Sequence, residues 1–440
     1  MTRVADQDSA SPLELSRSNA LWPETIKAIP AGVQTFSKAP SQHVEGVSPC
    51  YTVKGKGCRS WDLDDNIYID YMMGLGPIVL GFADEEVNRA AMEGMSLGVV
   101  ASLAHPLETK LSQKLIELIP CAEMVRFGKN GTDVTSAAVR AARGFTKRNK
   151  VAVCGYHGWQ DWYIGSTPRN MGVPESIQAL TLKFQYNNIK SLHALFQKHP
   201  GEIAAVIMEP VNFYEPEDDF LSKVKELTHK NGALLVFDEV ITGFRMNIGG
   251  AQKEYGVTPD LASFGKAMAN GFPISAVVGR SDVMEIFDKV FFSATFGGDL
   301  PSISAALATI EAMEQRQTLS HIHAMGARLK TGYASIVQSL GIEKITRMIG
   351  FDWWPEYLFF NTEGKASREI QSLFQQEIVR RGVLTRAGMM LCGAHQKEDI
   401  DQTLHVFEQA LFVVKDAVRT ESVLERLDGP VIQPVIRKVD

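Results

Sequence analysis

Two carboxylates and one lysine carry the first chemical signal in this chain. Asp238 and Glu239 directly follow a run of five apolar residues, and Lys266 stands among small residues and glycines in the segment LASFGKAMANGFP. Carboxylates at the carboxyl end of a strand lie where open α/β sheets bind ligands, and burying one is costly unless a cation faces it. A lysine in a tight pocket loses solvation and becomes a nucleophilic amine. We expect Asp238 to face a cationic group and Lys266 to form a Schiff base, although exposed loop acids and a surface lysine show the same local pattern.

A phosphate-binding turn is predicted in the segment VRFGKNGTDV. A short strand there runs through Asn130, Gly131 and Thr132 directly into a helix, and the free N–H groups of a helix N-terminus bind phosphate. Neither GxxxxGK[ST] nor GxGxxG occurs, so the turn matches no nucleoside-triphosphate loop and no dinucleotide fingerprint. An ordinary strand-to-helix turn is the alternative.

A flat ligand could be covered by the aromatic segment CGYHGW. Tyr156 and His157 follow the apolar residues 151–154, so both belong to the end of a predicted strand. Tyr156 could cover an aromatic ring, and His157 could orient Tyr156 or donate to an oxygen of the ligand. Core aromatics are the alternative. Taken together, the four segments describe a site for pyridoxal 5'-phosphate, in which Asp238 keeps the pyridine nitrogen protonated and Lys266 forms the aldimine.

Alternating helical and strand-like segments must position these groups. Helices are predicted at 18–29, 107–118, 133–148, 220–231, 324–340, 367–381 and 400–420, and strands at 124–127, 151–154, 203–209, 233–238, 382–384 and in FDWWPEYLFF. This alternation predicts an α/β fold with a mostly parallel sheet covered by helices. We expect three parts: an N-terminal arm and strand meander (1–74) that belongs to a small domain, a large cofactor-binding domain (75–322) and a small α+β domain (323–440).

Composition excludes several other classes of protein. Among 440 residues, 45 are Lys or Arg and 51 are Asp or Glu, and this net charge of −6 argues against a nucleic-acid partner. Five scattered cysteines without a CxxC pair, and His321 and His323 without further ligands, predict no metal site. No apolar run reaches a bilayer-spanning length, and the polar N-terminus lacks a secretory pattern, so a cytoplasmic location away from membranes is expected.

The sequence resembles the class III aminotransferases of fold type I, and in particular the glutamate-1-semialdehyde 2,1-aminomutase subgroup. The resemblance covers roughly residues 20–420 and is most specific in DEVITGFR and FGKAMANGFP, with PAGVQTFSKAP, GCRSWDLDDNIYIDY, GPIVLGFADEEV, YHGW and the Met208–Pro210 triplet in support.

The resemblance implies a role for each matching residue. Lys266 is the Schiff-base lysine, Asp238 the pyridinium partner and Tyr156 the stacking ring. The phosphate and the rest of the cofactor contact Asn130, Gly131, Thr132, His157, Glu209 and Val240. Thr295, in SATFGGDLP, matches a threonine that reaches the phosphate of the neighbouring subunit, which implies a homodimer with shared active sites.

The sequence also departs from the subgroup, in part at positions that the resemblance assigns to substrate. Leu75 stands where the subgroup has tryptophan, Lys38 replaces an arginine, and Asn130 replaces a serine. An acidic residue is absent from the stretch 384–395, and the sequence GDLP (298–301) replaces Gly-Asn-Pro. Lys38 and Leu75 are candidate substrate contacts, although a surface lysine explains Lys38 equally well. We expect an aminotransferase that moves an amino group from a donor to a small ketone or aldehyde; a 2,1-aminomutase is the alternative.

Overall fold

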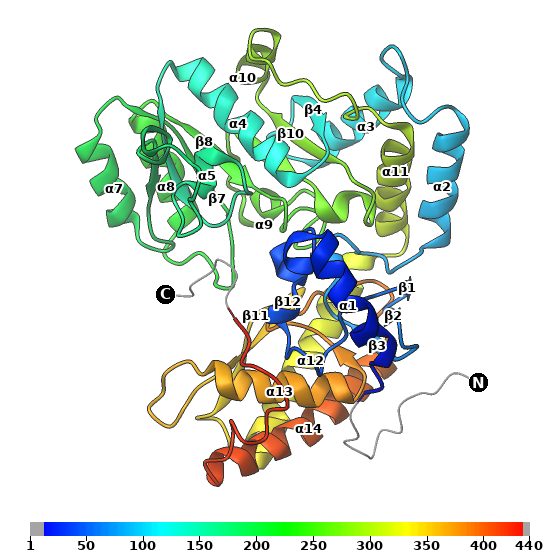
Figure 1. Cartoon of the computed structure of the whole chain (residues 1–440). Coiled ribbons are helices and arrows are strands. Elements are labelled where there is room, and N and C mark those ends of the chain that lie inside the picture. The colour runs from blue at the N-terminus through cyan, green and yellow to red at the C-terminus, as the bar shows by residue number, and fades with distance from the viewer. Residues whose placement is uncertain (1–12, 434–440) are drawn as a thin grey trace. The chain divides into compact units, whose positions relative to one another are not determined.

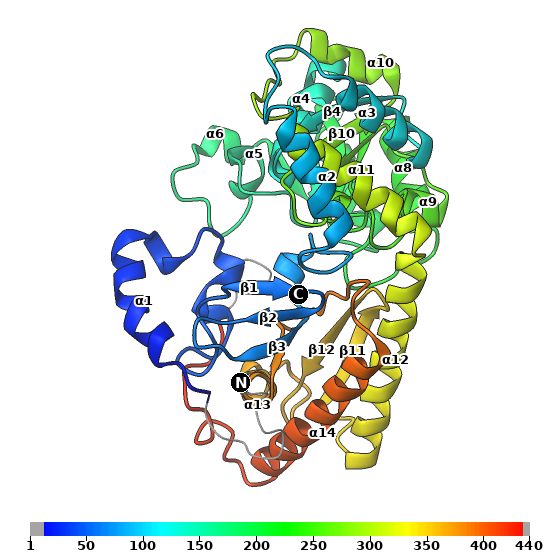
Figure 2. The ribbon, with the colours of Figure 1, turned by 90° about the vertical axis from the view of Figure 1, so that its right-hand side faces the viewer.

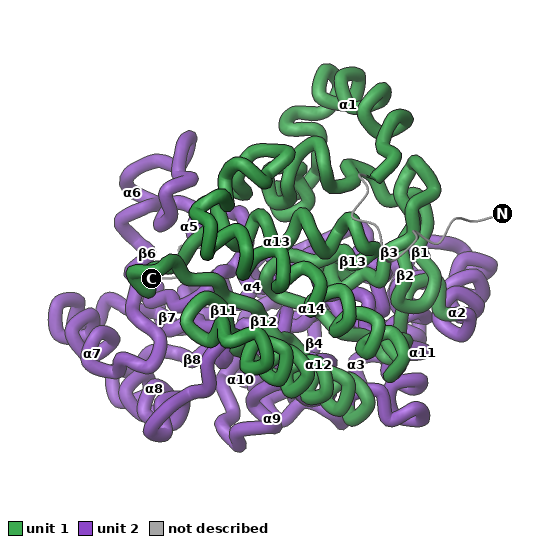
Figure 3. Tube along the Cα trace, turned by 90° about the horizontal axis from the view of Figure 1, so that it is seen from below, with its two compact units in different colours: residues 1–75, 80–84, 320–440 green, residues 76–79, 85–319 purple. Residues whose placement is uncertain are grey.

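The computed structural model describes residues 13–433, which form two compact units. Unit 1 holds the described residues up to Leu75, residues 80–84 and those from Ser320 onward, and unit 2 holds residues 76–79 and 85–319 (Figure 3). The predicted arm at residues 1–12 lies outside the described part of the chain. In residues 13–433 no helix combines the length and the apolar composition that crossing a bilayer requires.

A seven-stranded sheet forms the centre of unit 2, in the order β4-β10-β9-β8-β7-β5-β6 (Figure 1). Its strands are β4 Met124–Gly128, β5 Lys150–Cys154, β6 Thr181–Lys183, β7 Ile203–Met208, β8 Leu234–Asp238, β9 Leu261–Phe264 and β10 Ser275–Gly279. Only β10 runs against the others, pairing antiparallel with both β4 and β9. The predicted α/β class with a mostly parallel sheet is therefore confirmed.

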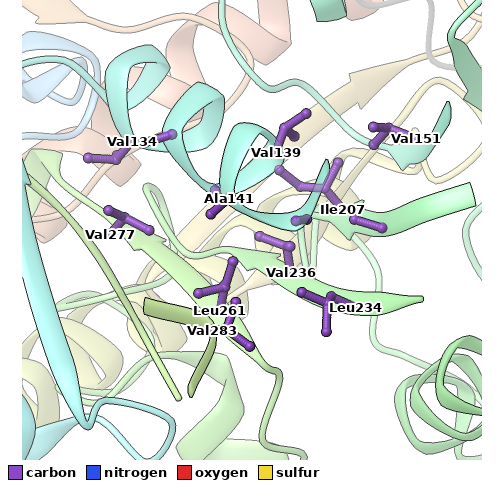
Figure 4. Close-up of a cluster of buried hydrophobic side chains, with 14 of the residues drawn as sticks. Val134, Val139, Ala141, Val151, Ile207, Leu234, Val236, Leu261, Val277 and Val283 are labelled. Atoms are coloured by element: carbon purple, nitrogen blue, oxygen red, sulfur yellow. The ribbon is translucent and has the colours of Figure 1, made fainter. Parts of the chain in front are cut away.

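Helices surround this sheet. Those that are partly exposed are amphipathic, and those that are buried are apolar. They are α2 Glu85–Ser96, α3 Pro106–Leu118, α4 Gly131–Thr146, α5 Asp161–Ile164, α6 Glu175–Gln178, α7 Ile189–Lys198, α8 Phe220–Lys230, α9 Ala251–Tyr255, α10 Ser281–Met284 and α11 Leu300–Gln315. Helix α4 covers one face, where its Val134 and Val139 pack in one buried cluster with Val236, Leu261 and Val277 of β8, β9 and β10 (Figure 4). This packing places the N-terminus of α4 at the edge where β8 and β9 end.

Unit 1 contains two small sheets and long helices (Figure 2). The first sheet, β1-β2-β3-β13, consists of β1 Lys54–Lys56, β2 Arg59–Trp61, β3 Ile67–Asp70 and β13 Val383–Leu384, and the second pairs β11 Thr346–Phe351 with β12 Trp354–Phe359. Its helices are α1 Ser16–Ala28, α13 Arg368–Arg380, α14 Lys397–Arg419 and, from Ser320 onward, α12 Thr318–Leu340. The predicted meander therefore joins its sheet to a strand from the far end of the chain.

The segment FDWWPEYLFF is strand-like as predicted, but the chain reverses inside it, so its residues belong to two strands. Phe351 ends β11 and pairs with Trp354, which begins β12, so Asp352 and Trp353 form a two-residue turn. The segment has none of the glycine or asparagine residues that mark such turns. Trp353 is buried and stacks on Phe351 with ring centroids 5.5 Å apart, so aromatic packing stabilises this turn.

Candidate active site

Asp238 is the last residue of β8, and its carboxylate is buried. Its Oδ2 accepts a hydrogen bond from Nδ1 of His157 at 2.7 Å, and its Oδ1 accepts from the N–H of Val240 at 3.2 Å. His157 is buried as well, and Thr135 of α4 donates to its carbonyl oxygen at 2.9 Å. The segments containing His157 and Asp238 thus meet at one sheet edge, and the imidazole fixes one oxygen of the carboxylate.

The neighbouring Glu239 has a different task. It is fully buried, and its carboxylate accepts hydrogen bonds from the N–H groups of Ala251 at 2.7 Å and Gln252 at 3.0 Å and from the hydroxyl of Thr242. Burial raises the pKa of Glu239, while these hydrogen bonds oppose that rise. Glu239 therefore ties the DEVITGFR segment to the start of α9, and its oxygens are occupied by the protein itself.

The start of α4 forms the predicted phosphate turn. Asp133 of the first helical turn accepts from the N–H groups of Lys129 at 3.0 Å and Asn130 at 2.7 Å. The next N–H groups, of Gly131 and Thr132, belong to the first turn of a helix, which has no partners for them within the helix. A Cβ at Gly131 would lie 2.8 Å from Cγ1 of Val240, so only glycine allows this approach.

The YHGW segment lies directly against this helix start. Gly158 has φ +103°, and a Cβ there would lie 2.3 Å from the hydroxyl of Thr132. Tyr156 is partly exposed and meets Tyr163 edge-on at 5.6 Å between centroids. The N–H of Tyr156 donates to Oε2 of Glu209 at 3.0 Å, so the residue after β7 positions the second residue after β5. The structure brings Tyr156, Thr132 and Glu209 to one edge of the sheet.

Lys266 lies two residues beyond β9 at this same edge. Asp238 pairs with Ser263 of β9, which precedes Lys266 by three residues. Lys266 is half-buried and has φ +43°, a left-handed conformation that costs a non-glycine residue about 1 kcal/mol or more. The residues after it, Ala267 to Ala269, are fully buried, and their packing holds the lysine in this conformation.

Whether pyridoxal phosphate fits this site can be judged from three buried polar atoms of the described residues. The hydroxyls of Thr132 and Ser263 and Nε2 of His157 have no hydrogen-bond partner within the protein. Leaving such groups unpaired costs about 1–3 kcal/mol each, so they are suited to partners that a ligand supplies. With the helix N-terminus for an anion and the buried carboxylate for a protonated ring nitrogen, these residues fit the cofactor.

Three further predicted residues belong to other segments of the chain. Thr295 is exposed in the segment that precedes α11, on unit 2. Lys38, exposed at the end of the short 3₁₀ turn Phe36–Lys38, and Leu75, with φ +78°, belong to unit 1, so their contact with substrate stays a prediction. Within residues 13–433 no three His, Cys, Asp or Glu side chains gather as a metal site.

Sequence reasoning missed one cluster beside the phosphate turn. Lys129 of that turn forms an ion pair with Asp299, the N-cap residue of α11. The available signal was the aspartate in the GDLP sequence that replaces the subgroup's Gly-Asn-Pro. Only the fold brings the two charges together, across 170 residues of sequence.

This architecture, with these groups at the carboxyl edge of the sheet, is that of the pyridoxal phosphate enzymes of fold type I. A family model described as "Aminotransferase class-III" matches residues 41–411. The chain belongs to the class III aminotransferase family, as its motifs predicted, and pyridoxal phosphate is the cofactor of that family.

Individual relatives cover nearly the whole chain. A 3-aminobutyryl-CoA aminotransferase of Cloacimonas acidaminovorans is 35% identical over 416 residues, 92% of this chain and 99% of the relative. A glutamate-1-semialdehyde 2,1-aminomutase of Methanosphaera stadtmanae is 32% identical over 426 residues, 91% of this chain and 99% of the relative. The structure of the FumI protein of Sphingopyxis sp. MTA144, in its PLP internal aldimine form, matches with a TM-score of 0.87 and 26% identity, over 95% of this chain and 99% of that one.

Proposed function

We propose that this aminotransferase moves an amino group between two separate molecules, an amino donor and a small ketone or aldehyde. The observation that carries the proposal is a set of departures at positions that the resemblance assigns to substrate: Leu75, Lys38 and the missing acid between 384 and 395. A mutase must retain its intermediate while the amine changes carbon, which requires a closed site. Loss of the tryptophan and the acid weakens that closure and favours release of the deaminated product.

Each residue of the site receives a role in this proposal. Bound pyridoxal phosphate supplies the electron sink for negative charge at the carbon that bears the amino group. Lys266 holds the cofactor covalently and then carries a proton to and from that carbon through Nζ. Asp238, held by His157, keeps the proton on the ring nitrogen, and Tyr156 covers the ring.

The remaining contacts hold the cofactor in place. In the proposal, Asn130, Gly131 and Thr132 bind the phosphate through the start of α4, while Glu209 and Val240 border the ring. Lys38 is assigned to an anionic group of the substrate. A lysine is a point charge rather than a planar two-donor fork, so this position suits a phosphate or hydroxylated chain as well as a carboxylate.

The first donor to examine is a 3-aminoacyl thioester. One relative, 35% identical over most of both chains, is named a 3-aminobutyryl-CoA aminotransferase. A substrate of this class carries its amino group one carbon further from the carbonyl than an α-amino acid does. Each donor is incubated with the pyridoxal form of the enzyme, and absorbance and mass spectrometry measure how much pyridoxamine form it produces. This yield ranks the donors.

A homodimer with shared sites is the proposed assembly. Unit 2 exposes large apolar side chains on α2 and the segment after it and near Thr295: Met92, Met95, Leu97, Val99, Leu103, Phe291 and Phe296. These segments are joined, because the N–H of Leu300 donates to the carbonyl of Val99 at 3.0 Å. Exposed apolar side chains gathered in this way are typical of an interface between subunits.

A cytoplasmic location is proposed from the cysteines. All five are free thiols, as expected of a protein in a reducing compartment. Fractionation of the source cells with an antibody against this chain tests the location.

The test of transfer between two molecules uses glutamate-1-semialdehyde. The enzyme in its pyridoxamine form is incubated with this compound, and 5-aminolevulinate is measured with and without a separate amino donor. We expect little 5-aminolevulinate. Efficient conversion that needs no donor would instead establish the 2,1-aminomutase.

A further inference from the structure

The ammonium group of Lys129 lies at the meeting point of three segments of the site. Its Nζ donates to the carbonyl oxygen of Pro273 at 2.7 Å and to the carboxylate of Asp299, and it lies 3.5 Å from the hydroxyl of Ser302. The side chains of Lys129 and Asp299 are mostly buried, with exposed fractions of 19% and 11%. This contact is therefore shielded from solvent far more than an ordinary surface ion pair.

Lys129 itself belongs to the proposed phosphate turn. It directly precedes Asn130, and Asp133 accepts hydrogen bonds from the N–H groups of both residues. The hydroxyl of Ser275 on β10 also donates to the carbonyl oxygen of Asn130 at 2.9 Å. Gly131 and Thr132 follow directly in the chain, so a displacement of Lys129 would also displace their N–H groups.

Asp299 belongs to the segment that carries Thr295. Its carboxylate accepts from the N–H and hydroxyl of Ser302 at 3.3 and 2.8 Å, so it caps α11. Gly297, between Thr295 and Asp299, packs so closely on β4 that a Cβ would lie 3.0 Å from the carbonyl oxygen of Phe127. The segment from Thr295 to Asp299 is therefore held against β4, the strand that leads into the phosphate turn.

Pro273 belongs to the loop that leaves Lys266. The short 3₁₀ turn Lys266–Ala269 continues through Asn270 to Pro273, and β10 begins at Ser275. Lys129 is the one side chain described above that contacts both this loop and the segment of Thr295. It links the turn, the lysine loop and the partner-facing segment through a single charged group.

We infer that Lys129 is a positioning residue for the phosphate end of the cofactor, acting through its ion pair with Asp299. A mostly buried charge that loses its partner is costly, whereas a pair of neutral groups of similar shape is tolerated. Removing either charge should therefore displace the phosphate turn, and removing both should largely restore it. The inference rests on the proposed assignment of the phosphate to Asn130, Gly131 and Thr132.

A direct role for the ammonium charge makes the opposite prediction. If Lys129 attracted the phosphate by its charge, Asp299 would compete with the phosphate for that charge. Asp299→Asn would then tighten pyridoxal phosphate binding, and the double variant would not recover. The two roles are separable because only positioning makes both single variants weaker and the double variant normal.

The experiment measures cofactor affinity of the full-length apoenzyme rather than turnover. Pyridoxal phosphate and pyridoxal, which lacks the phosphate, are titrated into wild type, Lys129→Gln, Asp299→Asn and the double variant, with absorbance as the readout. Lys114→Gln is the matched control, because Lys114 on α3 also forms an ion pair with an acid of another element, Glu314 of α11, at 3.1 Å. Thermal unfolding of each apoenzyme is recorded in parallel.

We expect each single variant to bind pyridoxal phosphate about tenfold more weakly, with pyridoxal affinity unchanged. The double variant should return to within about threefold of wild type, and Lys114→Gln should bind as wild type does. Equal losses for both ligands, unchanged affinities, or tighter binding by Asp299→Asn would each overturn the inference. If Lys129→Gln does not fold, Asp299→Asn carries the same test. A wild-type protein that binds no pyridoxal phosphate would contradict the proposed function instead.

Discussion

At the scale of single residues, the adjacent acids Asp238 and Glu239 offer an internal comparison. We expect Asp238→Asn to retain cofactor but to lower turnover by orders of magnitude, because an uncharged pyridine is a poor electron sink. Glu239→Gln should instead lower the free energy of unfolding by about 1–3 kcal/mol, since its amide cannot accept all the hydrogen bonds of the carboxylate. Turnover per folded enzyme and denaturant unfolding measure the two effects. Near wild-type turnover in Asp238→Asn would contradict the role assigned to Asp238.

The covalent role of Lys266 is also a prediction at this scale. Borohydride reduction of the cofactor-loaded protein followed by peptide mapping should find the pyridoxyl label on Lys266, because it follows β9 at the edge where Asp238 ends β8. Lys266→Ala should fold, bind no covalent label and lose turnover. Lys253→Ala, on α9, should behave as wild type. A label on another lysine would contradict the assignment.

At the scale of elements, His43 joins separate segments of unit 1. The amide of Gln375, on α13, donates to Nδ1 of His43 at 3.1 Å and to the carbonyl oxygen of Thr385, just after β13, at 2.9 Å. Burial, with a smaller effect of the Arg386 charge, lowers the pKa of His43 from 6.5 to about 4. The folded protein therefore keeps this imidazole neutral at pH values where the unfolded chain protonates it.

This pKa predicts acid sensitivity of unit 1. The stabilising contribution is complete above pH 6.5 and is lost as the pH falls toward 4, by up to about 3 kcal/mol for a shift of this size. In His43→Gln, the midpoint temperature of unfolding should fall less between these pH values than it does in wild type. His405→Gln, at an exposed histidine of α14, should leave the fall unchanged. Identical pH profiles for wild type and His43→Gln would refute the prediction.

At the scale of the whole molecule, the proposed dimer predicts complementation. Lys266→Ala and Thr295→Glu should each be inactive as pure dimers, the second because a carboxylate would repel the partner's phosphate. A mixed dimer regains one site that contains both native residues, so mixing the two proteins should restore part of the activity. Activity is measured on mixed dimers verified by dual affinity tags; absence of recovery in them would count against shared sites. Sedimentation of the wild-type protein gives the oligomeric state.

The local pattern of the chain was sufficient for most elements of the large sheet. The apolar runs 203–209 and 233–238 became β7 and β8, and the periodic segment 107–118 became α3, because burial on one or both faces imposes a readable spacing. The helix predicted at 133–148 begins earlier, at Gly131, since the phosphate turn itself is its first turn. The strand character of FDWWPEYLFF was predicted, but the reversal that makes it part of the hairpin β11–β12 was not, because no glycine or asparagine marks the turn at Asp352 and the buried Trp353.

The sequence by itself was sufficient to identify the family and the cofactor, because the motifs that carry the resemblance follow strand ends that a local pattern reveals; the residues that hold the cofactor are predicted from the same motifs. The sequence predicted Asp238 as the ligand-facing acid, but it did not reveal that Glu239 is bound to the backbone N–H groups of α9. Nor did it pair Lys129 with Asp299 or His157 with Asp238. These contacts join residues far apart in the chain, and only the packing of strands and helices into one sheet edge brings such groups within hydrogen-bonding distance.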